Sequence, residues 1–211
     1  MTRTSGTSDF PMTTEDPLRI RYTHHEQVHE LIDVVTYCVE AVSMSFDGWD
    51  DDRVRGPGLY IAVVSGDSVA PYADPMGANR WPVESYPAVT RELDPFFEAA
   101  SEVALERDGA VVISVDGAVL EQMVRFRDLT PGELAALEDV YRADYADWIG
   151  ARHMSAADTS VRPDVVTTIT LSEEDGRVTL FENGRFQDYS RDHLGAPWRT
   201  PPRETTDHPL D

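Results

Sequence analysis

Two short segments carry the residue types that nucleotide phosphate chemistry needs. The first, 107–110, places the carboxylate of Asp108 and a Gly-Ala pair at the start of an apolar run. The second, 150–155, places Arg152 beside His153 just after a glycine, where a helix is expected to begin. A carboxylate can hold a divalent metal, and an arginine beside the N–H groups of a helix start can bind phosphate. Each segment alone is weak evidence.

A third polar segment, Ser172–Gly176, comes directly after an apolar strand pattern and contributes Glu173, Glu174 and Asp175. In isolation these carboxylates are explained equally well by a solvated hairpin, because the chain is acidic throughout. The order of the three segments, rather than any one of them, therefore carries the functional prediction.

A competing motif lies near the N-terminus. Residues 25–29 match the pattern H-E-x-x-H, which on a helix places two zinc-binding imidazoles one turn apart beside a general base. The pattern opens an expected helix with no sheet before it, and Ile32 stands where the longer metzincin motif has glycine. Asp47 or Asp50 could provide a third ligand, but an acidic chain always offers one. We therefore rank a zinc hydrolase below the phosphate site.

The apolar periodicity predicts an α/β (α+β) chain with a mixed central β-sheet surrounded by helices. It indicates helices over about 25–45, 87–106 and 131–148, and a short helix after Gly150. It indicates strands at 59–64, 110–115, 118–126, 165–171, 177–181 and 185–187, with a long loop after the first strand. A tight turn is expected at 116–117, and Thr130–Glu133 has the spacing of a capping box. We expect one domain, 18–190, between flexible tails at 1–17 and 191–211.

Charge and composition narrow the class of protein. The 211 residues carry a formal net charge of −21, and all 18 basic residues are arginine. Dense carboxylates keep a surface hydrated, so we expect a halophilic, cytoplasmic protein. A basic stripe for nucleic acid, an apolar stretch of membrane-spanning length and a signal-peptide pattern are all missing from the sequence. The single cysteine, Cys38, lies on the apolar stripe of the first helix and is expected to be a core residue.

Taken in order, the three segments resemble the motifs of the diadenylate cyclase family, which condenses two ATP molecules into cyclic di-AMP. That family has Asp-Gly-Ala at a strand start, Gly-Thr-Arg-His-Arg at a helix start, and Ser-Glu-Glu-Thr-Gly before a closing hairpin. The corresponding residues are Asp108-Gly109-Ala110, Gly150-Ala151-Arg152-His153-Met154 and Ser172-Glu173-Glu174-Asp175-Gly176. The resemblance extends from about residue 106 to 186 and, more weakly, back to residue 25. It implies the fold of the cyclase domain.

The resemblance also implies a role for each matched residue. Asp108 would lie beside the ribose 3′-hydroxyl and, with Glu174, hold Mn²⁺ or Mg²⁺, while Arg152 would stabilise charge on the α-phosphate. These three are the expected catalytic residues. The expected nucleotide-binding residues are Gly109, Ala110, Phe126, Ala151, His153, Ser155 and Ser172. Since each site would hold one ATP, cyclisation implies a homodimer whose two sites face each other.

Two departures from the family pattern bear on activity. Met154 replaces the second arginine of Arg-His-Arg, which removes a fixed positive charge, and Ala151 replaces threonine, which removes a hydroxyl. The stretch between the first two motifs is also longer than usual. Arg125 or Arg127 could supply the missing charge. A nucleotide-binding sensor without catalytic activity is therefore the alternative to the enzyme.

Overall fold

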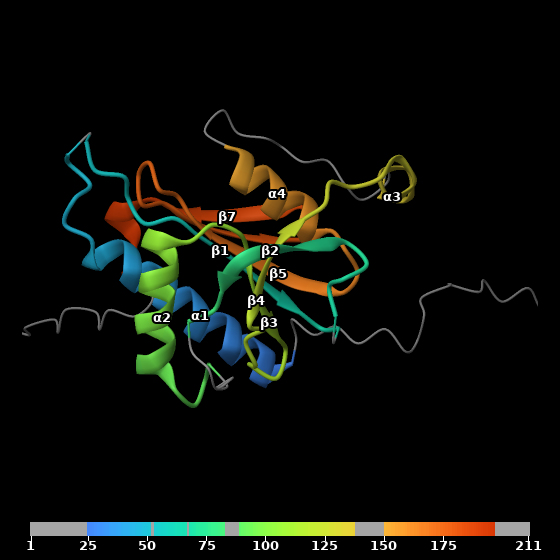
Figure 1. Ribbon diagram of the computed structural model, residues 1–211, viewed down its shortest axis with the longest axis horizontal. Coiled ribbons are helices and arrows are strands. Elements are labelled where there is room, and N and C mark those ends of the chain that lie inside the picture. The colour runs from blue at the N-terminus through green and yellow to red at the C-terminus, as the bar shows by residue number, and fades with distance from the viewer. Residues whose placement is uncertain (1–24, 52, 67, 83–88, 138–149, 197–211) are drawn as a thin grey trace, which may run out of the picture.

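The computed structural model describes residues 25–51, 53–66, 68–82, 89–137 and 150–196. It confirms the mixed α+β architecture, with a five-stranded sheet and a separate two-stranded sheet among the helices (Figure 1). The elements are α1 (Glu26–Ser45), β1 (Leu59–Val64), β2 (Ala73–Arg80), α2 (Leu93–Glu106), β3 (Val111–Ser114), β4 (Gln122–Phe126), α3 (Pro131–Leu137), α4 (Ala151–Ser160), β5 (Val165–Leu171), β6 (Val178–Glu182), β7 (Arg185–Tyr189) and the 3-10 turn η2 (Arg191–His193). None of the helices in these ranges combines the length and the apolar character that a membrane span requires.

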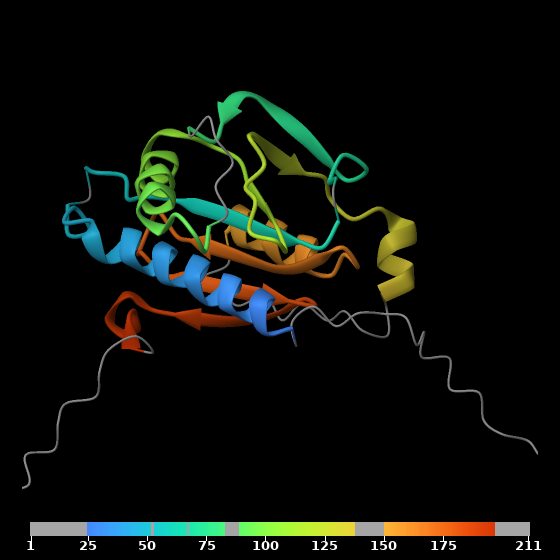
Figure 2. The same cartoon turned by 90° about the horizontal axis from the view of Figure 1, so that it is seen from below.

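The larger sheet has the strand order β3-β1-β5-β6-β7. Strands β1 and β3 are parallel, and β5, β6 and β7 follow in antiparallel pairing. All six residues of β1 are buried, because both faces of the sheet are covered. Leu59, Ile61 and Val63 belong to the core shared with α1 and α2, whereas the alternate residues of β1 belong to a core shared with α4, β2 and β4. Figure 2 shows α1 running lengthwise beside the strands.

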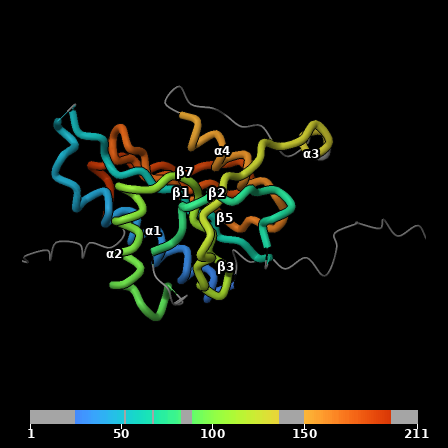
Figure 3. Tube along the Cα trace, viewed as in Figure 1, coloured from blue at the N-terminus to red at the C-terminus, as the bar shows by residue number. Residues whose placement is uncertain are grey.

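The loop predicted after β1 is wrong in part, because residues 73–80 form β2. This strand pairs antiparallel with β4, with Ala73 opposite Phe126 (Figure 3). Most of β2 is exposed, and it contains Pro75 and Gly77, so it lacks the alternating apolar pattern by which a strand is recognised. Proline and glycine are tolerated here because β2 is paired on one side only.

The expected hairpin partner of β3 is also corrected. The predicted strand 118–126 is reduced to β4, whose ladder is with β2. It meets β3 only through the bridges Ala110↔Val124 and Ile113↔Val119. The tight turn itself is confirmed, since Gly117 has a φ of +84° and Ser114 N–H donates to the carbonyl oxygen of Ala118 at 2.9 Å.

Helix α2 begins at Leu93, later than the predicted start at about residue 87. Val89 is buried as the apolar stripe suggested, but it lies before the helix, and its N–H donates to the carbonyl oxygen of Gly117 at 2.9 Å. Periodicity therefore identified a core residue correctly but assigned it to the wrong element. Residues 83–88 lie outside the described ranges.

The other helices begin where they were predicted. The capping box of α3 is confirmed: Glu133 N–H donates to Thr130 Oγ1 at 3.3 Å, and Thr130 N–H donates to Glu133 Oε2 at 2.7 Å. The predicted end of this helix, residue 148, falls within residues 138–149, which lie outside the description. Cys38 on α1 is buried, as expected, and burial raises the pKa of its thiol to about 12.

The described start of the expected C-terminal tail, residues 191–196, packs against the domain. Leu194 is fully buried, and Gly195 N–H donates to Glu40 Oε2 at 2.7 Å. This segment therefore contributes to the core. Residues 1–24 and 197–211 lie outside the description.

Arg162, just after α4, connects several elements at the rim of the second core. Its guanidinium donates to Glu133 Oε1 at 2.6 Å and to the carbonyl oxygen of Arg127 at 2.7 Å. It also lies 4.8 Å from the centroid of the Tyr72 ring. Only 5% of the side chain is exposed, so these contacts replace water at a buried charge.

We expect Arg162→Met to lower the free energy of unfolding by about 2 kcal/mol, because charged hydrogen bonds are lost while part of the desolvation cost is relieved. Urea denaturation followed by circular dichroism would measure the change. Arg185→Met, at an exposed position at the start of β7, is the matched control. An equal loss in both variants would contradict the connecting role of Arg162.

Candidate functional site

The predicted site lies at one edge of the larger sheet. Because β1 and β3 are parallel, the residues before them, Gly58 and Asp108–Ala110, lie at the same edge. Strand β5 is antiparallel to β1, with Leu171 opposite Leu59, so the segment after β5 reaches that edge as well. Helix α4 packs against β1, β5 and β6 and begins with the Arg-His pair. Strand pairing thus explains why motifs distant in sequence are neighbours.

These segments surround a cavity of about 410 Å³. All ten residues predicted to bind the nucleotide or to act in catalysis line it: Asp108, Gly109, Ala110, Phe126, Ala151, Arg152, His153, Ser155, Ser172 and Glu174. Six further residues complete the lining: Tyr60, Met76, Val124, Arg125, Gly150 and Glu173. The positions are findings of the structure, whereas the role of each residue remains a prediction.

The Asp108–Gly109 backbone has a conformation that requires glycine. Gly109 has a φ of +105°, and a Cβ at this position would lie 3.0 Å from Met76 Cγ and 3.2 Å from the carbonyl oxygen of Val124. Gly109 N–H donates to Asp108 Oδ1, and the side-chain amide of Asn79 donates to the Asp108 carbonyl oxygen, both at 2.9 Å. The carboxylate of Asp108 is therefore held on an exposed, well-defined turn at the rim of the cavity.

One wall of the cavity is aromatic. The rings of Tyr60 and Tyr72 lie 5.7 Å and 6.0 Å from that of Phe126, which is only 5% exposed. Little of the Phe126 ring is thus open to a base. The Tyr60 hydroxyl donates to the carbonyl oxygen of Ser155 at 3.2 Å, and burial raises its pKa, so the phenol stays neutral.

Arg152 and His153 enter the cavity from the first turn of α4. Arg152 Nη2 lies 3.3 Å from Glu173 Oε2, and the same oxygen lies 2.5 Å from Arg55 Nη2. His153 is 6% exposed, with its ring edge-on to that of Phe181. Burial, and then the charge of Arg152, lower the pKa of His153, which keeps the imidazole neutral near pH 7.

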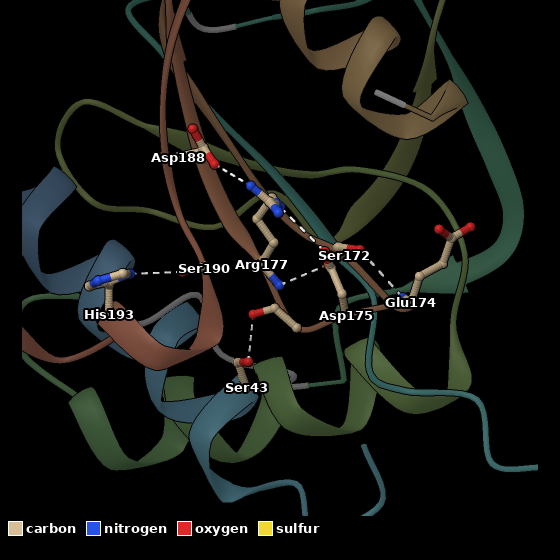
Figure 4. Close-up of polar contacts among 9 residues, drawn as sticks. Ser43, Ser172, Glu174, Asp175, Arg177, Asp188, Ser190 and His193 are labelled. Atoms are coloured by element: carbon tan, nitrogen blue, oxygen red, sulfur yellow. Dashed lines mark hydrogen bonds and ion pairs between the residues drawn. The ribbon is translucent and has the colours of Figure 1, made fainter. Parts of the chain in front are cut away.

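The loop between β5 and β6 is fixed by its own hydrogen bonds (Figure 4). Glu174 N–H donates to Ser172 Oγ at 3.3 Å, and the carbonyl oxygen of Gly176 accepts from Ser43 Oγ at 2.7 Å. Burial raises the pKa of Asp175, but hydrogen bonds from Ser172 and Arg177 outweigh burial and hold that pKa below its ordinary value. The exposed carboxylate of Glu174 points away from these contacts.

Sequence reasoning missed the partner of Arg152 and did not distinguish two arginines of β4 and its end. Glu173 was part of the third motif but was given no role. Arg125 lines the cavity and makes no hydrogen bond or ion pair within the described residues. Arg127 does not line it, because its guanidinium donates to the carbonyl oxygen of Ala70 at 2.8 Å and lies 3.6 Å from Asp74. Strand alternation would have separated the two only if the pairing of β4 had been known.

The carboxylates at the cavity suit a metal that arrives with a nucleotide. No group of three or more His, Cys, Asp or Glu side chains that could hold a metal occurs within the described ranges. Mg²⁺ and Mn²⁺ accept one or two carboxylates together with substrate phosphates and water, so Asp108 and Glu174 fit this chemistry. In the H-E-x-x-H segment, His29 is exposed and lies 3.3 Å from Asp33 rather than in a metal cluster.

Comparisons with known proteins establish the fold alone. No family model matches the chain, and no curated protein matches it. A hypothetical membrane spanning protein from Bacillus cereus has a similar structure, with a TM-score of 0.51 and 16% identity over 76% of this chain. This chain spans 64% of the length of that protein. DacA from Staphylococcus aureus, a diadenylate cyclase solved as a double mutant, has a TM-score of 0.47 and 16% identity over 80% of this chain and 92% of its own.

We expect the stability of the protein to depend on pH through His153. The lowered pKa of the folded state means that, as pH falls below about 6.5, the unfolded chain takes up a proton that the folded chain does not. This contribution is complete above about pH 6.5 and is lost as pH falls toward the lower folded pKa.

Urea unfolding between pH 8 and pH 5 measures this effect. His153→Gln should show a smaller loss of stability at acid pH than the wild type. The control, His193→Gln, changes an exposed side chain and should leave the pH dependence unchanged. Parallel profiles for the wild type and His153→Gln would contradict the assignment.

Proposed function

We propose that this protein is a diadenylate cyclase, which converts two ATP molecules into cyclic di-AMP and two pyrophosphates. The observation that carries the proposal is the convergence of all ten predicted residues, from four separate stretches of the chain, on one cavity. Three motifs picked out by their resemblance to one family need not have met in space. Their meeting supports a common ligand.

The start of α4 suits the binding of phosphate. Gly150 caps the helix without any side-chain hydrogen bond, and Gly150 to His153 all line the cavity. The first N–H groups of a helix have no partner within the helix, and they carry partial positive charge toward its start. Together with the guanidinium of Arg152, they would bind the triphosphate and stabilise the charge that develops as pyrophosphate leaves.

Asp108 is the residue we assign to the attacking hydroxyl. In each half-reaction the ribose 3′-oxygen of one ATP bonds to the α-phosphorus of the other, and the bond from that phosphorus to the pyrophosphate oxygen breaks. The hydroxyl proton leaves toward the Asp108 carboxylate, which is exposed at the rim of the cavity. Two such steps close the ring.

A bound Mn²⁺ or Mg²⁺ would lower the pKa of the hydroxyl and neutralise phosphate charge. Asp108 and Glu174 would hold it. The reaction requires two ATP molecules, while a cavity of about 410 Å³ in one chain has room for one nucleotide. We therefore propose that two protomers meet with their cavities facing each other, and the exposed positions of Asp108 and Glu174 suit such a meeting.

A nucleotide-binding sensor without activity is the second candidate. The observation in its favour is that Arg152 is already paired with Glu173, while the family's second arginine is replaced by Met154, which is 45% exposed. The site thus has less positive charge than the family pattern supplies. Such a site could bind ATP without stabilising the transition state.

The enzyme assay separates the two candidates. Purified protein incubated with ATP and Mn²⁺ at high salt should yield cyclic di-AMP, detected by mass spectrometry. We expect Asp108→Asn to reduce the rate at least a hundredfold, in line with the loss of a general base. Asp128→Asn, an exposed carboxylate off the cavity, is the matched control. ATP binding without product would favour the sensor, and neither binding nor product would overturn both candidates.

The two arginines near the end of β4 provide a second test. Arg125→Ala should weaken ATP binding about tenfold, the equivalent of about 1.4 kcal/mol, because a cation that lines the cavity is lost. Arg127→Ala should leave the affinity nearly unchanged, because that guanidinium is held by Ala70 and Asp74 outside the cavity. Isothermal titration calorimetry would measure both. Equal effects of the two substitutions would show that Arg125 does not contact the nucleotide.

A further inference from the structure

One carboxylate oxygen at the cavity is shared by two arginines. Glu173 Oε2 accepts from Arg55 Nη2 at 2.5 Å and Nε at 2.9 Å, and from Arg152 Nη2 at 3.3 Å. The Arg55 side chain is 75% exposed, whereas the side chains of Arg152 and Glu173 are 22% and 29% exposed. Only Arg152 and Glu173 line the cavity. The contacts of Arg55 are shorter and more numerous, so the Arg152 contact is the weaker one.

The position of this cluster is set by Gly58. A Cβ on Gly58 would lie 2.6 Å from Arg152 Nη1 and 2.9 Å from Glu173 Oε2, so both groups rest directly on a bare backbone. Gly58 N–H donates to the carbonyl oxygen of Ala104 at 2.8 Å, which ties this backbone to α2. The guanidinium and the carboxylate are therefore packed against a fixed surface.

We propose that Arg55 is a positioning residue that holds Glu173 so that Arg152 can exchange this carboxylate for the phosphates of an incoming nucleoside triphosphate. This inference rests on the proposed function, because it requires a triphosphate in the cavity. Arg55 itself lies outside the lining and acts through Glu173. Its role is to keep Glu173 compensated when Arg152 turns toward phosphate.

The charges of the cavity explain why such a holder is needed. Its lining contains three carboxylates, Asp108, Glu173 and Glu174, and two guanidinium groups, Arg125 and Arg152. When Arg152 binds phosphate, Glu173 would become a partly buried, uncompensated negative charge beside a polyanion. Arg55 prevents this by remaining on the same oxygen. The exchange then costs only the longer Arg152 contact.

Equilibrium binding of 3′-deoxy-ATP with Mn²⁺, measured by calorimetry, tests this arrangement without turnover, because the ligand lacks the attacking hydroxyl. The variants are Arg55→Ala, Glu173→Gln and the double variant. Arg53→Ala is the matched control, since it lies in the same loop and its backbone N–H, not its side chain, makes the hydrogen bond to Asp51. 3′-Deoxyadenosine, which has no phosphates, is the matched ligand control.

We expect Arg55→Ala to weaken 3′-deoxy-ATP binding about threefold, a size typical of an exposed ion pair. Glu173→Gln should tighten binding, and adding Arg55→Ala to it should have no further effect, because the carboxylate that Arg55 holds is gone. Arg53→Ala should bind as the wild type does, and no substitution should alter binding of 3′-deoxyadenosine. In the cyclase assay, Arg55→Ala should raise the KM for ATP and leave kcat unchanged.

Two results would overturn the inference while leaving the proposed function intact. One is wild-type affinity for 3′-deoxy-ATP in both Arg55→Ala and Glu173→Gln. The other is an equal loss on Arg55→Ala with and without the Glu173 carboxylate, which would show that Arg55 acts through another contact. If the wild-type protein does not bind 3′-deoxy-ATP, the proposed function fails and this inference fails with it.

Discussion

The pairing of β1 with two neighbours of opposite direction is the constraint on which the site depends. Parallel β3 and antiparallel β5 bring the start of two strands and the end of a third to the same edge. Because β1 is buried on both faces, a slip of one residue would exchange its two sets of core side chains. The register is therefore fixed by hydrophobic packing, and the polar groups at the edge take their positions from it. Asp108 and Ser172 need no direct contact to share a cavity.

The fold was predictable where burial gives a strong pattern. Continuous apolar runs identified β1 and β5, and glycine-containing turns identified the last two strands. Strand β2 escaped prediction because its pairing depends on backbone hydrogen bonds to β4 and not on an apolar face. Val89 shows a related limit, since periodicity reports burial without saying whether the backbone is helical. The residues of the site were found through their resemblance to known motifs, whereas Arg125 and Arg55 belong to no motif and are visible only in three dimensions.

Arginine is the only strongly basic residue in this chain, and it connects segments that are distant in sequence. Arg162 joins the end of α4 to α3, Arg55 joins the loop before β1 to the loop after β5, and Arg177 pairs with Asp188 on β7. A chain with a net charge of −21 repels itself, so each cation contributes most where it neutralises carboxylates near the core. The planar guanidinium can serve two acceptors at once, as Arg162 does. Salt would screen the exposed pairs far more than the buried one.

The replacement of arginine by Met154 changes where positive charge can be supplied. Met154 is exposed beyond the first residues of α4, so a cation there would approach a bound phosphate from the helix side. Arg125 approaches from the opposite side, because the bridge between Ala110 and Val124 places it beside Gly109. A triphosphate held between α4 and β4 would then lie closer to the exposed carboxylate of Asp108 than one held by the helix alone. The loss of one arginine is thus compatible with catalysis if the chain has moved the charge from a helix to a strand.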